Sequence, residues 1–289
     1  MKRKTAFFIS FLLLFQLIIP FGFGFEILYP NRENNISESM DIPYQDGWPQ
    51  LTSSRVDSSP IFADVDNDSS LEIIVGSGIS DDSKRKMYVF HEDGSIMDGW
   101  PISISYNIYG SPAVGDLDND GDLEIIAIDS LSIYVWHHDG APIDGWPKNY
   151  GSTTSPTLYD VDNDGDLEII TGTIDSFKKS DCARIDIWNH DGTAFPGWPV
   201  IITDYGFSTI EESSPAIGDV DGDGTVEIVI GVNSGSDDDW KGYVYVFHQN
   251  GSLMDVWPYC IGHVGQVYSA PGLSDLDDDG DLEIIVASN

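Results

Sequence analysis

The sequence predicts an all-β fold, a β-propeller of about five four-stranded blades. Three observations support this fold class. One unit recurs five times along the 289 residues, and its short β-branched and aromatic runs are separated by Gly, Asp and Pro. No stretch shows the helical period of apolar residues. A solenoid of sheets is the alternative arrangement for such repeats.

The five copies begin near residues 58, 110, 154, 213 and 269. Their first aspartates are 52, 44, 59 and 56 residues apart, which suits one propeller blade per copy. In the second copy we expect strand A at 111–117, strand B at 123–128, strand C at 133–138 and strand D around 145–147. The domain therefore extends over residues 26–289.

The two ends of the chain predict how the ring closes. The fifth copy stops directly after its B strand, whereas residues 46–51 (DGWPQL) resemble a D strand without its own A and B. We expect the N-terminal segment to supply the outer strands of the last blade, with 25–30 as a C strand. An incomplete ring is the alternative, because Tyr29 lies 19 residues before Trp48 while Trp136 lies only 10 before Trp146.

An acidic loop joins strands A and B in every copy. It reads Asp-x-Asp-x-Asp, usually followed by Gly, and it always has Glu at position 9. The candidate metal ligands, at positions 1, 3, 5, 7 and 9, are Asp64, Asp66, Asp68, Ser70 and Glu72; Asp116, Asp118, Asp120, Asp122 and Glu124; Asp160, Asp162, Asp164, Asp166 and Glu168; Asp219, Asp221, Asp223, Thr225 and Glu227; and Asp275, Asp277, Asp279, Asp281 and Glu283.

This spacing indicates up to five Ca²⁺ ions. Alternate carboxylates on a tight loop converge and repel one another unless a cation lies between them. Oxygen ligands favour Ca²⁺ over transition metals, and a loop that gives six or more oxygens favours it over Mg²⁺. We expect position 7 to contribute its backbone carbonyl and Gly121 to adopt a positive φ. An EF-hand is excluded because position 12 is never acidic: it is Val75, Ala127, Thr171, Ile230 and Val286.

The first loop departs from the others. Ser69 stands where the other copies have Gly, and Asn67-Asp68-Ser69 is a glycosylation sequon inside the loop. We therefore expect the site at Asp64 to be the weakest of the five.

These residues resemble the FG-GAP and VCBS repeat family, the calcium-loop blades of integrin α-subunit propellers and of many secreted microbial proteins. The resemblance rests on SPAVGDLDNDGDLEIIAI and its four sister segments and covers residues 45–289. It implies Ca²⁺ at the five loops, on the face opposite the ligand-binding loops. Glu at position 9 and about five blades depart from integrins, so integrin ligands are not implied.

Composition limits the partners. The 49 Asp and Glu residues against 13 Lys and Arg give a formal net charge of −36, which disfavours nucleic acid and anionic headgroups. Residues 1–25 have a basic start and an apolar run, which predict a cleaved signal peptide or, alternatively, an uncleaved membrane anchor. We therefore expect a secreted or cell-surface protein, monomeric, with no other membrane contact.

Other residue patterns favour structural roles. His91, His137 and His248 align at one repeat position, and His138 and His190 lie next to it, which indicates a role in the hairpin between strands C and D rather than catalysis. The repeated Trp-Pro pairs favour packing between blades over a sugar-binding platform. Whether Cys182 and Cys260 form a disulfide is left open by the sequence.

Two functions are compatible with these patterns. The first is a non-catalytic adhesion or ligand-binding module that binds a protein or a glycan. Its specificity would lie in the variable connections between strands B and C, at 76–86, 172–183 and 231–242. The second is an enzyme or accessory module, similar to a lyase, that acts on extracellular polysaccharide. It would depend on cationic side chains in or directly beside these connections, Lys178, Lys179, Arg184 and Lys241.

Overall fold

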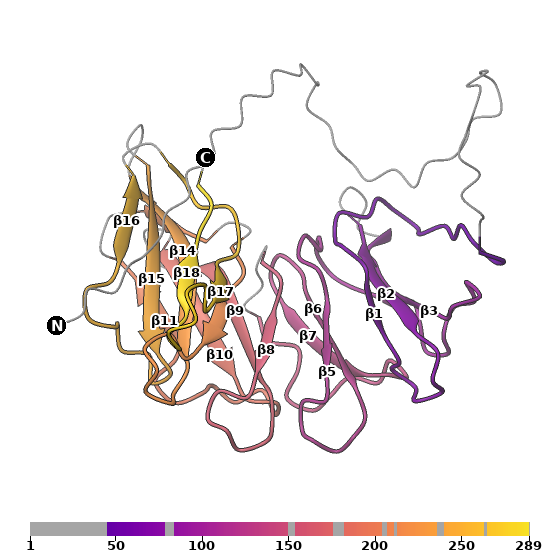
Figure 1. Ribbon diagram of the computed structural model, residues 1–289. Coiled ribbons are helices and arrows are strands. Elements are labelled where there is room, and N and C mark those ends of the chain that lie inside the picture. The colour runs from indigo at the N-terminus through magenta and orange to yellow at the C-terminus, as the bar shows by residue number, and fades with distance from the viewer. Residues whose placement is uncertain are drawn as a thin grey trace, which may run out of the picture.

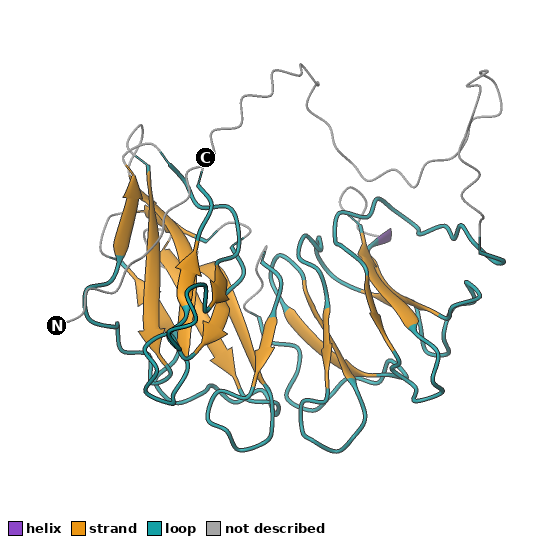
Figure 2. Ribbon diagram, in the orientation of Figure 1, coloured by secondary structure: helices purple, strands orange, loops and turns teal. Residues whose placement is uncertain are grey.

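The structure, a computed structural model, describes residues 45–78, 84–149, 154–175, 182–203, 207–210, 213–235, 240–262 and 265–288. Their regular elements are β-strands, apart from one 3₁₀ turn at Lys84 (Figure 2). The expected signal peptide at 1–25 and the expected C strand at 25–30 lie outside the described residues. Within the described ranges, no helix has the length and apolar character to cross a membrane.

Each repeat forms one antiparallel sheet, as the sequence predicts. The first sheet contains β1 (Ile61–Ala63), β2 (Glu72–Ser77), β3 (Lys86–Phe90) and β4 (Ile102–Ser103). The second contains β5 (Ala113–Gly115), β6 (Glu124–Ile128) and β7 (Ile133–His137). The third contains β8 (Thr157–Tyr159), β9 (Glu168–Asp175), β10 (Cys182–Trp188) and β11 (Val200–Ile202). The fourth contains β12 (Phe207–Thr209), β13 (Ala216–Gly218), β14 (Glu227–Gly235), β15 (Lys241–His248) and β16 (Tyr259–Gly262), and the fifth contains β17 (Gly272–Ser274) and β18 (Glu283–Ile285).

Strands A, B and C lie where the sequence places them, but strand D begins after the Trp-Pro pair instead of at it. In the second sheet only an isolated bridge between Ile133 and Lys148 marks the D position. The fourth sheet has an unpredicted strand, because β12 pairs with the far half of β14 while β13 pairs with its first half. In the described residues the fifth sheet has strands A and B only.

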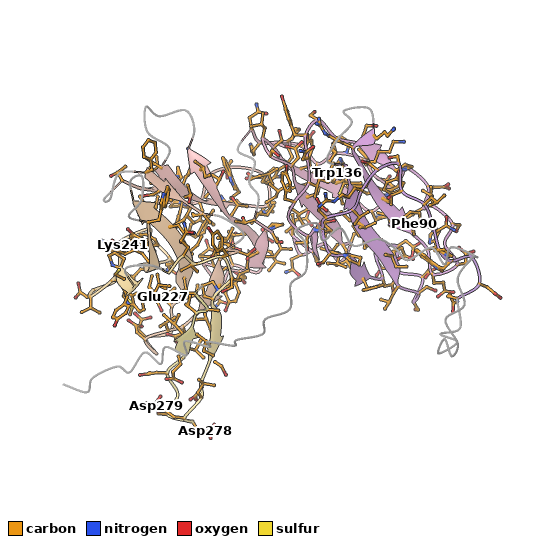
Figure 3. The ribbon with its side chains drawn as sticks, turned by 90° about the horizontal axis from the view of Figure 1, so that it is seen from above. Phe90, Trp136, Glu227, Lys241, Asp278 and Asp279 are labelled. Atoms are coloured by element: carbon orange, nitrogen blue, oxygen red, sulfur yellow. The ribbon has the colours of Figure 1, made fainter. Side chains whose placement is uncertain are left out.

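The five sheets follow one another along an arc in the order of the sequence (Figure 1). The first sheet lies at one end of this arc, and β17 and β18 overlap the fourth sheet in this view. Figure 3, seen from above, shows the loop of Asp278 and Asp279 at the other end. The described residues therefore form an open row of blades, and a closed ring is not seen among them.

The hydrophobic core lies between the sheets instead of within one domain centre. Adjacent strand residues point to opposite faces, so Ile125 packs in a cluster with the first sheet while Ile126 packs with the third. In the same way Ile228 faces the third sheet and Val229 faces the fifth. This explains why the B strands read as continuous apolar runs, since both of their faces are covered.

The Trp-Pro pairs join each sheet to the next one, as predicted. The Trp100 ring packs edge-on against Trp136 at 5.7 Å, and its indole N–H donates to the His138 carbonyl at 2.8 Å. The same contact joins Trp146 to the carbonyl of His190 and Trp198 to that of Gln249. The five Trp-Pro peptide bonds are cis. These tryptophans therefore stabilise the joints between blades and are not displayed as a platform.

The two cysteines do not form a disulfide in this structure. Cys182 is buried in β10, and Cys260 is exposed in β16. The variable connections between strands B and C are described only in part, and Lys178 and Lys179 lie outside the described residues.

We predict that Trp100→Phe lowers the free energy of unfolding by about 1 to 2 kcal/mol, because it removes a buried hydrogen bond and part of an edge-on aromatic contact. Trp257→Phe is the matched control. Among the described residues no acceptor faces the Trp257 indole N–H, so its loss should cost less. Urea unfolding of both variants measures the difference, and equal losses would contradict the assigned role of the indole hydrogen bond.

Candidate metal sites

The acidic loops fold around the carboxylate at position 1. In the second loop one oxygen of Asp116 accepts from the backbone N–H of Asp120 and the other from that of Gly121, both at 3.0 Å. The Asp120 side chain in turn accepts from the backbone N–H of Asp122 at 2.9 Å. The same three hydrogen bonds are present in all five loops, and the length of each differs by at most 0.3 Å between loops.

Two residues of each loop adopt the left-handed backbone conformation. Gly121 at position 6 has φ of 97°, as predicted, and Ser69 takes 73° at the same place without being glycine. Position 4 is also left-handed, which we did not expect from the sequence: Asn119 has φ of 54° and Asn163 has 62°. The signal was present, because every copy has Asn, Gly or Asp at position 4, and these residues tolerate this conformation best.

Glu at position 9 closes the loop from the first residue of each B strand. Its carboxylate is buried in the first four copies, with at most 2% of the residue exposed. One oxygen of Glu124 accepts from the backbone N–H of Leu117, at position 2, at 2.9 Å, and the other copies have the same bond at 2.7–3.1 Å. The carboxylate therefore ties the start of the loop to the sheet.

The aligned histidines contact the second oxygen of this glutamate. Nδ1 lies 3.3 Å from Glu72 in His91 and 3.2 Å from Glu227 in His248. His137 lies 3.5 Å from Glu124. The sequence predicted a structural role for these histidines in the hairpin between strands C and D. The structure shows that their side chains contact the glutamate of the acidic loop from the end of strand C. In the third copy His190, one residue further along, contacts Asp166 at 3.1 Å instead.

The structure brings the predicted ligands together. In the second, third and fourth loops, carboxylate oxygens of positions 1, 3 and 9 lie within 4.8 Å of one another, and in the first loop positions 1, 3 and 5 do so. These groups contain Asp116, Asp118 and Glu124; Asp160, Asp162 and Glu168; Asp219, Asp221 and Glu227; and Asp64, Asp66 and Asp68. His91 also forms such a group with Asp66 and Glu72.

At position 7, the side chains of Asp122 and Asp166 contact residues outside these groups. Asp122 faces Asn67 of the neighbouring loop at 3.4 Å, and Asp166 faces His190. Thr225 donates its hydroxyl hydrogen to Asp223. This agrees with a position that would offer a backbone carbonyl instead of a side chain. The fifth loop has the same backbone network, but Glu283 is only half-buried there.

The electrostatics of the loops fit a cation. Burial raises the pKa of Glu124 and Glu227, and the nearby loop aspartates raise it further. In Glu168, burial together with Asp160, Asp162 and Asp164 outweighs the hydrogen bond from Val161 and raises the pKa to about 7. A buried carboxylate beside like charges is thus costly to ionise, and a divalent ion at this point removes the cost. The oxygen donors suit a hard cation.

We predict that Ser69→Gly raises the free energy of unfolding by about 1 kcal/mol. Glycine adopts the left-handed conformation without the steric cost that a Cβ brings. At the equivalent glycines 121, 224 and 280, no atom lies within 4 Å of an added Cβ, so the change removes backbone strain without leaving a cavity. Chemical denaturation checks this, with Ser69→Ala as the control that retains the Cβ. Equal stabilities of the two variants would contradict the prediction.

We predict that the chelated protein loses stability as the pH rises from about 4.5 to about 7. The folded state holds a proton on Glu168 in this window whereas the unfolded state does not, because the folded pKa is about 7 against an ordinary value of 4.5. Glu168→Gln should remove a large part of this pH dependence and stabilise the chelated protein above neutral pH, by on the order of 3 kcal/mol at most.

The control is Asp144→Asn, which makes the same charge change at an exposed position. Urea unfolding in chelator across this pH range measures both variants. A pH dependence that Glu168→Gln leaves unchanged would show that burial does not raise the pKa of this carboxyl as stated.

Comparison with known proteins confirms the family resemblance. The family model of the FG-GAP-like repeat matches residues 64–127 and 219–286. These two stretches are FG-GAP-like repeats. They contain the loops that begin at Asp64, Asp116, Asp219 and Asp275, and the loop at Asp160 shares their hydrogen-bond network. No curated protein matches the chain.

Several solved structures have a similar fold. The PilY1 C-terminal domain of Pseudomonas aeruginosa is 15% identical, with 75% of this chain and 52% of that chain covered at a TM-score of 0.50. The V. cholerae biofilm matrix protein Bap1 is 18% identical, with 74% and 42% covered at 0.40, and BBS1N in complex with ARL6DN is 13% identical, with 83% and 68% covered at 0.40. The chain thus spans about half the length of the first two, and the likeness concerns the fold alone.

Proposed function

We propose that this chain is a calcium-stabilised, non-catalytic binding module of an exported or cell-surface protein. The observation that carries the proposal is the repeated group of two loop aspartates and one buried glutamate at the start of a B strand. A solvated turn has no need for a carboxylate that is buried at the same place in four copies. In this proposal Ca²⁺ binds the side chains at positions 1, 3, 5 and 9 and the backbone carbonyl at position 7.

The export of the chain is part of this proposal. It rests on the basic and apolar residues at 1–25, and on the abundance of Ca²⁺ outside cells that would keep the loops filled. FG-GAP-like repeats in the chain support the same placement.

The ligand would bind at the other end of the strands. β14 runs from Glu227 at the acidic loop to Gly235, and β15 returns from Lys241, so Gly235 and Lys241 lie at the end of the sheet away from the acidic loop. Figure 3 views the sheets from above and labels Glu227 and Lys241 in the fourth sheet. The connections at this edge differ in length and composition between copies, which suits specific recognition of a protein or a glycan.

The contacts of two kinds of side chain support a role without catalysis. The histidines that could act as bases face the loop carboxylates, as described above. Arg184, a candidate for substrate binding, forms a buried bidentate ion pair with Asp186 at 2.7 and 2.8 Å. Its guanidinium group therefore stabilises the third sheet.

We predict that the protein binds four or five Ca²⁺ ions and that a chelator lowers its melting temperature strongly. Each ion stabilises the folded state by about 2.7 kcal/mol when its free concentration is 100 times its dissociation constant. Titration calorimetry and thermal melting in Ca²⁺, in Mg²⁺ and in chelator measure this. Asp160→Asn should remove one ion, whereas Asp144→Asn should remove none. The absence of calcium binding, or equal melting in all three conditions, would overturn the proposal.

The polysaccharide hypothesis from the sequence is tested separately. The pure protein is incubated with an acidic polysaccharide, and new chain ends are measured with and without Ca²⁺. We expect none, and the release of ends above that of boiled protein would replace the binding module with a lyase-like enzyme.

A further inference from the structure

Consecutive acidic loops contact each other through residues that lie between expected metal ligands. Position 2 lies between the ligands at positions 1 and 3, and position 8 lies between those at positions 7 and 9. At the first three joints between neighbouring sheets, the apolar residue at position 2 of one loop packs in the same cluster as the residue at position 8 of the next loop. These pairs are Val65 with Leu123, Leu117 with Leu167, and Val161 with Val226.

The joint between the second and third sheets shows this contact in detail. The Leu117 carbonyl accepts from the backbone N–H of Leu167 at 2.9 Å, and Leu117 is only 1% exposed. The Leu167 side chain lies over Gly115, directly before the second loop, because a Cβ added to Gly115 would be 3.1 Å from a methyl carbon of Leu167. The backbone and the side chain of Leu167 therefore both tie the end of the third loop to the start of the second.

Both partners of this contact are also linked to an expected ligand of their own loop. The backbone N–H of Leu117 donates to the buried carboxylate of Glu124 at 2.9 Å. Leu167 directly precedes Glu168, whose carboxylate accepts from the backbone N–H of Val161 at 2.8 Å. A displacement of either leucine would therefore move expected ligands in both loops.

A second contact joins position 4 of one loop to positions 6 and 7 of the next. The side-chain amide nitrogen of Asn67 lies 3.4 Å from a carboxylate oxygen of Asp122. The same nitrogen of Asn119 would be 3.2 Å from a Cβ added to Gly165. Because position 7 is expected to offer its backbone carbonyl to the ion, this contact also reaches a ligand of the following loop.

We propose that neighbouring acidic loops bind Ca²⁺ cooperatively, and that the packing of position 8 on position 2 of the preceding loop carries the coupling. An ion fixes the ligands on both sides of these positions, so a filled loop holds the contacting segment of its neighbour in the arrangement that binds the next ion. This inference rests on the proposed function, because it requires that the loops bind Ca²⁺. It goes beyond that function, since independent sites would serve a binding module equally well.

Repulsion between two bound ions acts in the opposite direction. Salt screens this repulsion, because the Debye length falls from about 8 Å at physiological ionic strength to about 3 Å at about 1 M. The contact between Leu117 and Leu167 is apolar and involves the backbone, so salt does not screen it. Measurements in about 1 M salt therefore isolate the coupling that the contact carries.

The test is a Ca²⁺ titration of the full chain, labelled with ¹⁵N at glycine and followed by two-dimensional NMR at this salt concentration. In the second to fifth loops the glycine at position 6 donates its backbone N–H to the aspartate at position 1, so its signal reports the occupancy of its own loop. Asp160→Asn should empty the third loop and raise the Ca²⁺ midpoint at Gly121, in the second loop, by about fivefold or more. Asp116→Asn should raise the midpoint at Gly165 by the same factor, because coupling between two sites is reciprocal.

Two matched controls accompany these variants. Asp275→Asn makes the same change in the fifth loop, which does not adjoin the second, and should leave the midpoint at Gly121 unchanged. Leu167→Ala removes the contact but no ligand, and in this background Asp160→Asn should shift the midpoint at Gly121 by less than about twofold. Leu71→Ala makes the same change at position 8 of the first loop, where the leucine is 54% exposed, and should leave the coupling intact. Circular dichroism checks that each variant is folded.

The outcomes separate this inference from the proposed function. Glycine signals that respond to Ca²⁺ with midpoints independent of the neighbouring loop would overturn the coupling and leave the calcium-binding module in place. The same holds for a midpoint at Gly121 that falls when the third loop is empty, and for coupling that Leu167→Ala leaves intact. If none of the position 6 glycines responds to Ca²⁺, the proposed function fails and this inference fails with it.

Discussion

The structure depends on one constraint: a small sheet of short strands has two apolar faces and cannot bury either of them with its own residues. Each face is buried only when another sheet lies against it. The clusters around Ile125 and Ile126 show this directly, because these adjacent residues belong to different joints. The tryptophan contacts and the burial of position 2 in the first four loops follow from the same need for a neighbour.

The packing of the sheets also buries charged carboxylates of the acidic loops. Because the first four B strands are covered on both faces, the glutamate that begins each of these four is buried, and its charge must be balanced by the residues around it. A backbone N–H and a histidine satisfy part of this demand. The raised pKa of Glu168 shows that the balance is incomplete without a cation. In the proposed calcium-bound protein, metal binding and the packing of the blades are coupled, since the same carboxylate takes part in both.

The two ends of the strands have different roles. The ends that carry the acidic loops repeat one network in all copies, down to the left-handed residues at positions 4 and 6. The opposite ends carry connections that differ from copy to copy. An edge with one repeated hydrogen-bond network can support a variable edge without sharing residues with it, and this division suits the proposed binding module.

The sequence by itself determined the repeat, the strand class and the loop, because these are local: five copies in one register, alternating apolar residues, and carboxylates two residues apart. It also identified Gly121 and the packing role of the Trp-Pro pairs. Only the tertiary structure decided that His91 faces Glu72, that β12 extends the fourth sheet and that Ile125 and Ile126 belong to different joints. These features join residues from different strands or sheets, and a pattern along the chain does not contain the distances between them.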